Sequence, residues 1–311
     1  METPPLTTPE PADRATPDAV AGSWVEMLPQ SWKPYARLAR ADRPIGAWLL
    51  FWPCAWGTAL VGGLPQESYL VLLFLIGSFA MRSAGCVYND IVDRDLDASV
   101  ERTRDRPLAS GTVSLKAAWA LLSSLSLLGL VVLLQLGGFA QVVALCSLLL
   151  VAGYPFMKRI TWWPQAWLGL TFNWGALVGF AAIAGSLPPA ALTLYAAGLF
   201  WTLGYDTIYA LQDIEDDALA GIKSSARRLG GNVRVGVASF YAITVLLLAA
   251  ALLLAAPEQP LVVAALLPAA LHLLWQVRAL HSTDTVGTLR LFRANTVTGA
   301  LVFAACLVAG L

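Results

Sequence analysis

The sequence contains few charged residues. Asp, Glu, Lys and Arg make up 13% of its 311 residues, whereas they make up about 25% of an average soluble domain. No long polar stretch follows residue 44, so a separate soluble domain is not expected. Hydrophobic residues account for 58% of the chain and its mean hydropathy is +0.66. These values predict an integral membrane protein surrounded by the lipid bilayer.

Cysteine and histidine are also scarce. The four cysteines are scattered through apolar stretches with no C-x-x-C pair, which argues against a zinc or redox site and predicts packing in the core. His272 and His281 lie away from any acidic cluster, so a structural or surface role is expected. No G-x-G-x-x-G opens a helix, and a nucleotide-phosphate loop is therefore not predicted.

The remaining chain has room for about nine spans of about 20 residues. Apolar stretches predict an all-α membrane bundle, with helices at 44–62, 68–91, 114–135, 139–157, 163–185, 188–211, 235–255, 260–279 and 292–310. Residues 1–22, rich in Pro, Thr and acids, predict a disordered tail. Residues 23–42 mix aromatic and basic side chains, which favours a helix in the membrane interface. Residues 43–311 are predicted to form a single transmembrane domain.

Basic residues are distributed unevenly between the connections. With nine spans, all 20 Lys and Arg lie on one side of the membrane, and the positive-inside rule makes that side cytoplasmic. The N-terminus is then cytoplasmic and the C-terminus lies on the opposite side. Residues 1–22 fit neither a transit peptide nor a secretory signal, which favours a bacterial inner membrane. Because the basic residues follow topology and form no separate patch, nucleic-acid binding is not predicted.

Two acidic patches end apolar stretches on the predicted cytoplasmic side. In N-D-I-V-D-R-D-L-D, Asn89, Asp93 and Asp97 are four residues apart, so they would share one face of a continuing helix. In D-T-I-Y-A-L-Q-D-I-E-D-D, Asp213 and Asp217 are also four apart. An Asp at the centre of a membrane helix costs about 2.5–3.5 kcal/mol. Carboxylates at such positions therefore indicate a function.

The residue types in these patches favour magnesium. Oxygen ligands without His or Cys suit Mg²⁺, which binds one or two carboxylates and completes its shell with water and substrate phosphates. Basic side chains follow both patches or lie in a third connection, among them Arg106, Lys158 and Lys223. They would bind the phosphate oxygens that the metal leaves free. The pattern predicts a magnesium-dependent diphosphate site open to the cytoplasm.

The function of the acidic patches and the role of Arg82 each have an alternative interpretation at this point. A cation-coupled transporter also carries membrane carboxylates, but it places them at mid-membrane on broken helices, whereas these patches end spans on one side. Arg82 lies seven residues before Asn89 inside a predicted span. It is either an internal partner for an acid or a substrate contact.

At the acidic patches the sequence resembles the UbiA family of membrane prenyltransferases, within it the 4-hydroxybenzoate polyprenyltransferases of ubiquinone biosynthesis. The resemblance covers residues 43–224. The matching motifs are R-P-I-G from Arg43, N-D-x-x-D-x-x-x-D from Asn89, R-P-L-x-S-G from Arg106, Y-P-x-x-K-R-x-T-x-x-P-Q from Tyr154, N-W-G from Asn173, D-T-x-Y-A-x-x-D-x-x-D-D from Asp206 and G-I-K-S from Gly221.

The resemblance implies a reaction that transfers a polyprenyl group from polyprenyl diphosphate to 4-hydroxybenzoate, on the ring carbon ortho to the hydroxyl. It implies Mg²⁺ as cofactor. The implied metal ligands are Asn89, Asp93, Asp213 and Asp217, with Asp90 and Asp97 in the same pattern. Homogentisate, a naphthoate, a haem or a chlorophyllide are alternative acceptors in the same superfamily.

The other site residues have implied roles in substrate binding and proton transfer. Tyr154 and Lys158 would contact the diphosphate, together with Asn89 and the cations Arg106 and Lys223, and Arg43 would bind the aromatic acid. A carboxylate would take the ring proton. Asp206 is the first candidate for this step, and Asp213 is the alternative.

Overall fold

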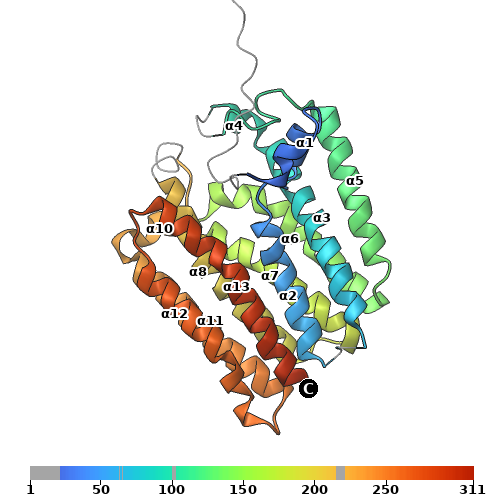
Figure 1. The fold of residues 1–311 in the computed structure, drawn as a ribbon, viewed down its shortest axis with the longest axis vertical. Helices are drawn as coiled ribbons and strands as arrows, with labels where there is room; N and C mark the ends of the chain where they lie inside the picture. The colour runs from blue at the N-terminus through green and yellow to red at the C-terminus, as the bar shows by residue number, and fades with distance from the viewer. Residues whose placement is uncertain (1–21, 63, 65, 100–102, 215–220) are drawn as a thin grey trace, which may run out of the picture. The chain divides into compact units, whose positions relative to one another are not determined.

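A computed structural model describes residues 22–311 except 63, 65, 100–102 and 215–220 (Figure 1). This described part is helical and contains no strand, as predicted for an all-α protein. The helices are η1 (Trp24–Met27), α1 (Lys33–Leu38), α2 (Ile45–Leu60), α3 (Ser68–Val92), α4 (Arg94–Ser99), α5 (Leu115–Leu133), α6 (Gly138–Ile160), α7 (Pro164–Ala184), α8 (Pro189–Tyr209), η2 (Ala210–Asp213), α10 (Ser225–Leu229), η3 (Gly230–Asn232), α11 (Val233–Ala255), η4 (Pro260–Leu266), α12 (Leu267–Ala279) and α13 (Thr285–Gly310).

The long helices follow the predicted apolar stretches, with two clear differences. Helix α13 begins at Thr285 instead of residue 292, because Asp284 caps it by accepting a hydrogen bond from the Gly287 N–H at 2.8 Å. Its polar first turns are therefore helical although hydropathy did not include them. The first part of the stretch 260–279 is the 3₁₀ helix η4, and the α-helix begins only at Leu267.

Seven helical stretches of the described chain are long and apolar enough to cross a membrane. They are α3, α5, α6, α7, Ser225–Ala255, Pro260–Ala279 and α13. Helix α2 is apolar but only 16 residues long. The predicted class of polytopic helical membrane protein is confirmed. The count of nine spans and their orientation remain predictions.

The chain forms two compact units, which are described separately. Unit 1 comprises residues 1–44 and 83–126, and unit 2 comprises residues 45–82 and 127–311. Residues 1–21 of the predicted tail lie outside the described residues. The segment 23–42 contains the two short helices η1 and α1. Its place in the membrane interface and the single domain over 43–311 remain predictions.

Unit 1 is organised around a small apolar core next to the first acidic patch. The core consists of Leu38, Val87, Leu108, Val113 and Ala118, each almost completely buried. These residues come from α1, the second half of α3, the connection that follows α4, and the start of α5. Packing of Val87 therefore anchors α3 just before Asn89.

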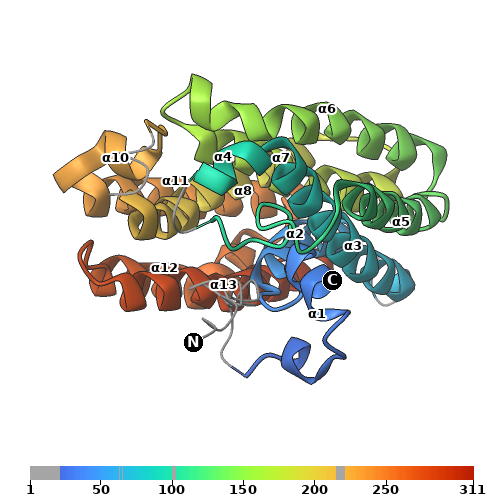
Figure 2. The same cartoon turned by 90° about the horizontal axis from the view of Figure 1, so that it is seen from above.

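In unit 2, the helices α2, α7, α8, α11 and α13 surround the main core (Figures 1 and 2). Glycines allow α2 and α7 to approach closely. A Cβ atom at Gly57 would overlap the Ala176 carbonyl oxygen, and one at Gly179 would overlap that of Cys54. In lipid, where burial of apolar surface does not drive helices together, such small residues make close packing possible.

Hydrogen bonds between buried side chains add to this packing in unit 2. The Trp201 indole donates to Asn295 Oδ1 at 2.8 Å, and the Tyr241 hydroxyl donates to Gln276 Oε1 at 2.9 Å. Asn295 Nδ2 also donates to Gln276 Oε1, at 3.0 Å. These bonds join α8, α11, α12 and α13, and they satisfy polar groups that would be costly to leave unpaired away from water.

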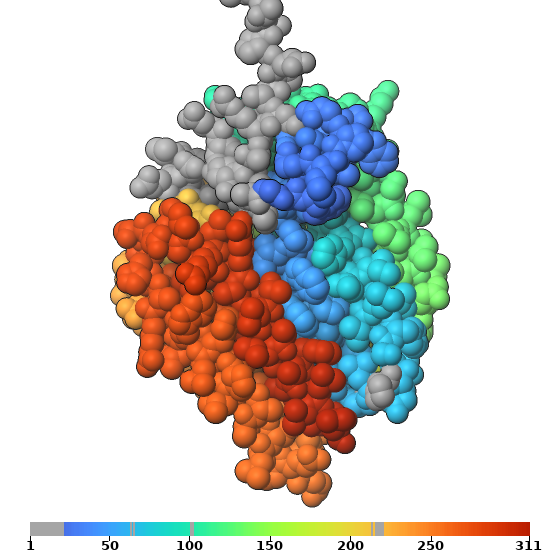
Figure 3. Space-filling view, viewed as in Figure 1, coloured from blue at the N-terminus to red at the C-terminus, as the bar shows by residue number. Residues whose placement is uncertain are grey.

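The cysteines and the outer surface agree largely with a membrane protein. Cys54, Cys86 and Cys306 are buried as expected, whereas Cys146 is exposed on α6. Several large apolar side chains of η4 and α12 are exposed; Leu261 is 85% exposed and Leu267 60%. Figure 3 shows this segment in orange on the surface. An exposed apolar face of this kind suits contact with lipid tails.

Candidate active site

The first acidic patch lies where α3 passes into α4. Helix α3 ends at Val92, Asp93 is a turn residue, and α4 begins at Arg94. Backbone hydrogen bonds of helical spacing continue through this break, from Asp93 N to Asn89 O at 2.9 Å and from Asp97 N to Asp93 O at 2.8 Å. The Asn89 amide donates to Asp93 Oδ2 at 3.2 Å, so these two side chains lie together.

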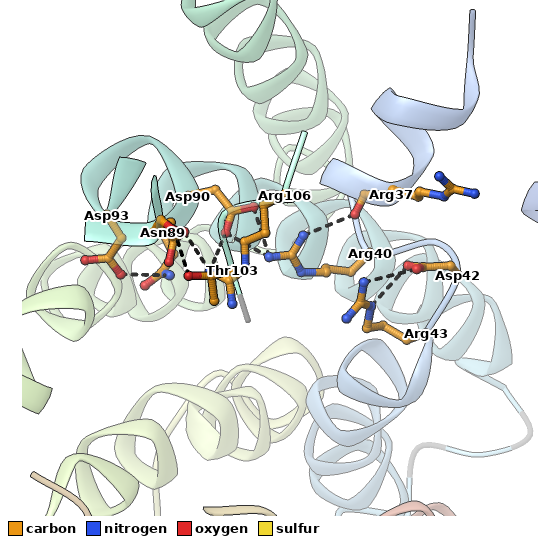
Figure 4. A network of polar contacts seen from close by, with 10 residues as sticks. Arg37, Arg40, Asp42, Arg43, Asn89, Asp90, Asp93, Thr103 and Arg106 are labelled. Carbon is orange, nitrogen blue, oxygen red and sulfur yellow. Dashed lines mark hydrogen bonds and ion pairs between the residues drawn. The ribbon is translucent and has the colours of Figure 1, made fainter. Parts of the chain in front are cut away.

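Two further acids of the patch, Asp90 and Asp97, contact arginines. Arg40 Nη2 lies 2.8 and 2.9 Å from the two oxygens of Asp90, and Arg106 Nη1 lies 2.7 Å from Asp97 Oδ2 and 3.5 Å from Asp90 Oδ1 (Figure 4). Asp90 and Asp97 are buried, and a buried carboxylate needs such partners. Burial raises the pKa of Asp97 above its ordinary value, and the neighbouring Arg106 opposes that shift.

Arg43 and Arg40 lie further along the same network. Arg43 Nε and Nη2 donate to the two oxygens of the buried Asp42 at 3.2 and 3.1 Å (Figure 4). Arg40 has φ +59° and is the single residue other than glycine with positive φ in the described chain. A left-handed backbone costs an L-residue about 1–2 kcal/mol.

The pair Asn89 and Asp93 suits a magnesium ion. Both residues provide side-chain oxygens, which Mg²⁺ prefers to nitrogen or sulfur. Within the described residues, no group of three or more His, Cys, Asp or Glu converges as a metal site. Such a group is not required, because Mg²⁺ typically uses one or two carboxylates and takes water and substrate phosphates for the rest of its shell.

The second acidic patch is only partly described. Asp206 is half-buried in the last turn of α8, which ends at Tyr209. The chain then continues as the 3₁₀ helix η2 to Asp213. Asp217 lies outside the described residues, and so does the Asp213 side chain. The predicted metal ligation by these two residues therefore remains a prediction.

Basic residues and motif segments converge beside the second patch in unit 2. The Lys223 backbone N–H donates to the Lys158 carbonyl at 3.1 Å, and Lys223 Nζ donates to the Ile160 carbonyl, also at 3.1 Å. Tyr154 and Lys158 are one turn apart in α6. The structure thus brings Lys223 to the end of the helix that carries Tyr154 and Lys158.

Neutral hydrogen bonds connect the same region to α7 and α8. Ser225 N donates to Gln165 Oε1 at 3.0 Å, and the hydroxyls of Ser225 and Thr207 lie 2.6 Å apart. Thr207 follows Asp206 directly, so the start of α10 is fixed to the helix that carries this carboxylate. Three motifs that are separate in the sequence therefore meet in unit 2.

Arg82 has an internal position in unit 2. Its guanidinium lies over the Phe172 ring, 5.5 Å from the ring centroid, in the arrangement of a cation–π contact. It also lies against Gly46, the glycine of R-P-I-G, where a Cβ atom would overlap Arg82 Nε. The absence of a side chain at Gly46 thus makes room for Arg82.

Sequence reasoning missed several residues that build the site. Asp42 belongs to no recognised motif although its partner Arg43 is the next residue, and the partner of Arg40 is distant in the sequence. Arg40 contacts an acid 50 positions away. Gln165 belonged to a recognised motif, but its contact with Ser225 60 positions later has no sequence signal.

Residues 50–298 match the model of the UbiA prenyltransferase family. The chain belongs to this family. It is 42% identical over 95% of its length to the mitochondrial 4-hydroxybenzoate polyprenyltransferase of Arabidopsis thaliana, covering 74% of that protein. It is 41% identical over 96% of its length to the human enzyme of the same name, covering 81% of it, and 42% identical over 92% to 4-hydroxybenzoate geranyltransferase 2 of Lithospermum erythrorhizon, covering 94%.

Solved structures of UbiA homologues share the fold. The apo structure of a homologue from Aeropyrum pernix K1 has a TM-score of 0.70 at 26% identity and covers 85% of this chain and 98% of its own. A homologue from Archaeoglobus fulgidus, bound to GPP and Mg²⁺, has a TM-score of 0.66 at 20% identity, with 89% and 99% covered. The predicted family is confirmed, and the UbiA-family chain is an integral membrane prenyltransferase.

Proposed function

We propose that this UbiA-family enzyme transfers a polyprenyl group from polyprenyl diphosphate to 4-hydroxybenzoate and releases diphosphate. The observation that carries the proposal is the identity of 41–42% to 4-hydroxybenzoate polyprenyltransferases over more than nine-tenths of the chain. Family membership also favours prenyl transfer over the transporter that acidic membrane residues alone left open.

Asn89 and Asp93 are proposed to bind one Mg²⁺ of the donor diphosphate, and Asp213 and Asp217 another. When bound, Mg²⁺ neutralises charge on the diphosphate oxygens and makes the diphosphate a better leaving group. Asp90 and Asp97, which contact Arg106, belong to the same patch, and Arg106 is proposed to bind the diphosphate.

The remaining site residues position the two substrates. Lys158 and Lys223 bind diphosphate oxygens, with Tyr154 one helical turn before Lys158. Arg43 binds the carboxylate of 4-hydroxybenzoate. The bond between C1 of the prenyl chain and the diphosphate oxygen breaks, and the ring carbon ortho to the hydroxyl bonds to C1. The proton displaced from that ring carbon passes to a carboxylate, Asp206 or alternatively Asp213.

We further propose that the protein lies in a bacterial inner membrane with this site facing the cytoplasm. The position of all 20 Lys and Arg on one side of the nine predicted spans supports this orientation. Reporter fusions at residues 111 and 311 test it. Cytoplasmic signal at 111 and periplasmic signal at 311 are expected, and the same signal at both sites would contradict nine spans.

Prenyl transfer is tested in membranes from cells that express the protein. We expect diphosphate release and a prenylated product when polyprenyl diphosphate, 4-hydroxybenzoate and Mg²⁺ are all present. EDTA abolishes both signals, and added Mg²⁺ restores them.

Parallel reactions with homogentisate and a naphthoate identify the acceptor. Product from one of them but not from 4-hydroxybenzoate would support prenyl transfer but replace 4-hydroxybenzoate as the proposed acceptor. No diphosphate release with any acceptor would contradict prenyl transfer and return a transport role to consideration.

A further inference from the structure

The end of helix α1 has an unusual residue at a position that favours glycine. Arg40 N donates to Arg37 O at 3.0 Å and Ala41 N donates to Ala36 O at 2.9 Å. This bonding pattern closes a helix through one residue in the left-handed conformation, and that residue is usually glycine because it has no Cβ. Here it is Arg40, with φ +59°. A backbone that only needed to turn would be more stable with glycine.

The Arg40 side chain contacts the first acidic patch. Its Nη2 lies 2.8 and 2.9 Å from the two oxygens of Asp90, and its Nη1 donates to the Arg37 carbonyl at 3.2 Å. Asp90 is only 1% exposed. Figure 4 shows the guanidinium of Arg40 directed at Asp90, with Asn89 and Asp93 on the side away from Arg40. The strained backbone thus accompanies a two-point contact with a buried acid.

Asp90 lies within the turn that carries the proposed metal ligands. It follows Asn89 directly and precedes Asp93 by three residues. A contact that holds the Asp90 carboxylate in place therefore also restrains the end of α3, which contains Asn89 and is followed by Asp93. The negative charge of Asp90 is also paired with Arg40 and, at 3.5 Å, with Arg106, so Asp90 is an arginine-bound carboxylate directly beside Asn89 (Figure 4).

We propose that Arg40 is a positioning residue for the magnesium site, acting through Asp90. This inference rests on the proposed function in that it assigns Mg²⁺ to Asn89 and Asp93. The left-handed backbone directs the guanidinium toward Asp90, and Asp90 holds the last turn of α3 in the geometry that the metal requires. Residues that orient metal ligands from behind in this way typically change metal affinity or activity about 10- to 100-fold when they are replaced.

Arg40→Gly and Arg40→Ala separate the backbone from the guanidinium. Both variants lose the contact with Asp90, but only alanine retains the strain of a positive φ. We expect both to raise the Mg²⁺ concentration for half-maximal turnover about 10- to 100-fold, and Arg40→Gly to unfold at the higher temperature of the two in detergent. Arg40→Lys keeps the charge but lacks the second nitrogen that donates to the Arg37 carbonyl, and it should give a smaller increase.

A binding measurement makes the test independent of turnover. Mn²⁺, which prefers similar oxygen ligands, is titrated into the purified full-length protein and followed by electron paramagnetic resonance. We expect weaker Mn²⁺ binding by Arg40→Gly than by wild type. In an Asp90→Asn background, Arg40→Gly should have little further effect, because the two residues act as one pair.

If Arg40→Gly needs the same Mg²⁺ concentration for half-maximal turnover as wild type, or binds Mn²⁺ as tightly, the inference is overturned. Arg40 would then serve only to end helix α1. Equal losses from Arg40→Gly with and without Asp90→Asn would also overturn it. Failure of the proposed function gives a different result: wild-type membranes would then show no prenyl transfer, while Mn²⁺ binding would still depend on Arg40.

Discussion

The two acidic patches share their spacing but differ in their surroundings. In unit 1, Asp90 and Asp97 are buried against Arg40 and Arg106, so much of the charge is balanced inside the protein. In unit 2, the segment after Asp206 is fixed by hydroxyl and amide contacts such as Thr207 to Ser225. The described contacts are thus ionic at the first patch and include neutral ones beside the second, and we expect the two patches to respond differently to mutation.

The largest expected effect tests what the patches have in common. Asp93→Ala and Asp213→Ala should each reduce turnover by at least about 100-fold, because each removes a proposed ligand of the Mg²⁺ that would stabilise charge on the leaving diphosphate. The measurement is product formation in membranes at matched protein levels. Asp95→Ala is the control, since Asp95 is exposed on α4. Normal turnover in either active-site variant would remove that patch from the metal assignment.

Lys158→Gln tests the basic character of the unit 2 side. A hydrogen bond from a charged donor contributes about 1.5–3 kcal/mol, so loss of one to the diphosphate should raise KM for polyprenyl diphosphate about tenfold or more. KM is measured from initial rates at saturating 4-hydroxybenzoate. Arg159→Gln, at the next and exposed position of α6, should leave KM close to the wild-type value. Equal changes in both variants would point to a general effect of charge.

Gly46→Ala tests whether turnover depends on the position of the Arg82 side chain in unit 2, as we propose for Arg40 in unit 1. The added methyl group overlaps Arg82 Nε, so the guanidinium must move. Displacement of about 1 Å in an active site can lower turnover about 100-fold, and we expect about tenfold because the side chain adapts. Gly85→Ala meets no atom within 4 Å and serves as the control. Unchanged kcat would show that Arg82 tolerates movement.

The smallest effect on turnover is expected away from both patches. In Gly179→Ala the new methyl group overlaps the Cys54 carbonyl oxygen between α7 and α2. Overpacking of this kind costs about 1–3 kcal/mol, so the unfolding temperature in detergent should fall while turnover per folded molecule stays near wild type. Gly138→Ala, with no atom within 4 Å, should unfold like wild type. An equal fall in both would contradict the close-packing argument.

Hydropathy predicted the positions of the long helices well, because a membrane span requires a continuous apolar stretch of sequence. The range 188–211 became α8 (Pro189–Tyr209), and 235–255 became α11 (Val233–Ala255). Hydropathy failed at α13, whose polar first turns depend on the cap at Asp284. The range 68–91 ended within one residue of the observed end of α3 at Val92, but hydropathy did not predict the helical hydrogen bonds that continue past Asp93.

The candidate site could be predicted only as a set of residue types. Spacing and motif resemblance selected Asn89, Asp93 and Lys158, since their chemistry is visible in the sequence. The pairing of Arg40 with Asp90 was not visible, because it depends on a helix end and on the core of unit 1, to which Leu38 of α1 and Val87 of α3 both belong. Which acid is paired with arginine is a property of the folded chain.

The bonds among Trp201, Asn295, Gln276 and Tyr241 have a consequence for how the bundle tolerates change. A leucine-rich helix in hydrocarbon has almost no preferred rotation about its own axis, because all its sides are equally soluble. A fixed polar contact selects one rotation for each of the four helices. Lipid-facing apolar residues near these contacts can then differ in size without rotating a helix. Each helix thus keeps the same face toward its neighbours.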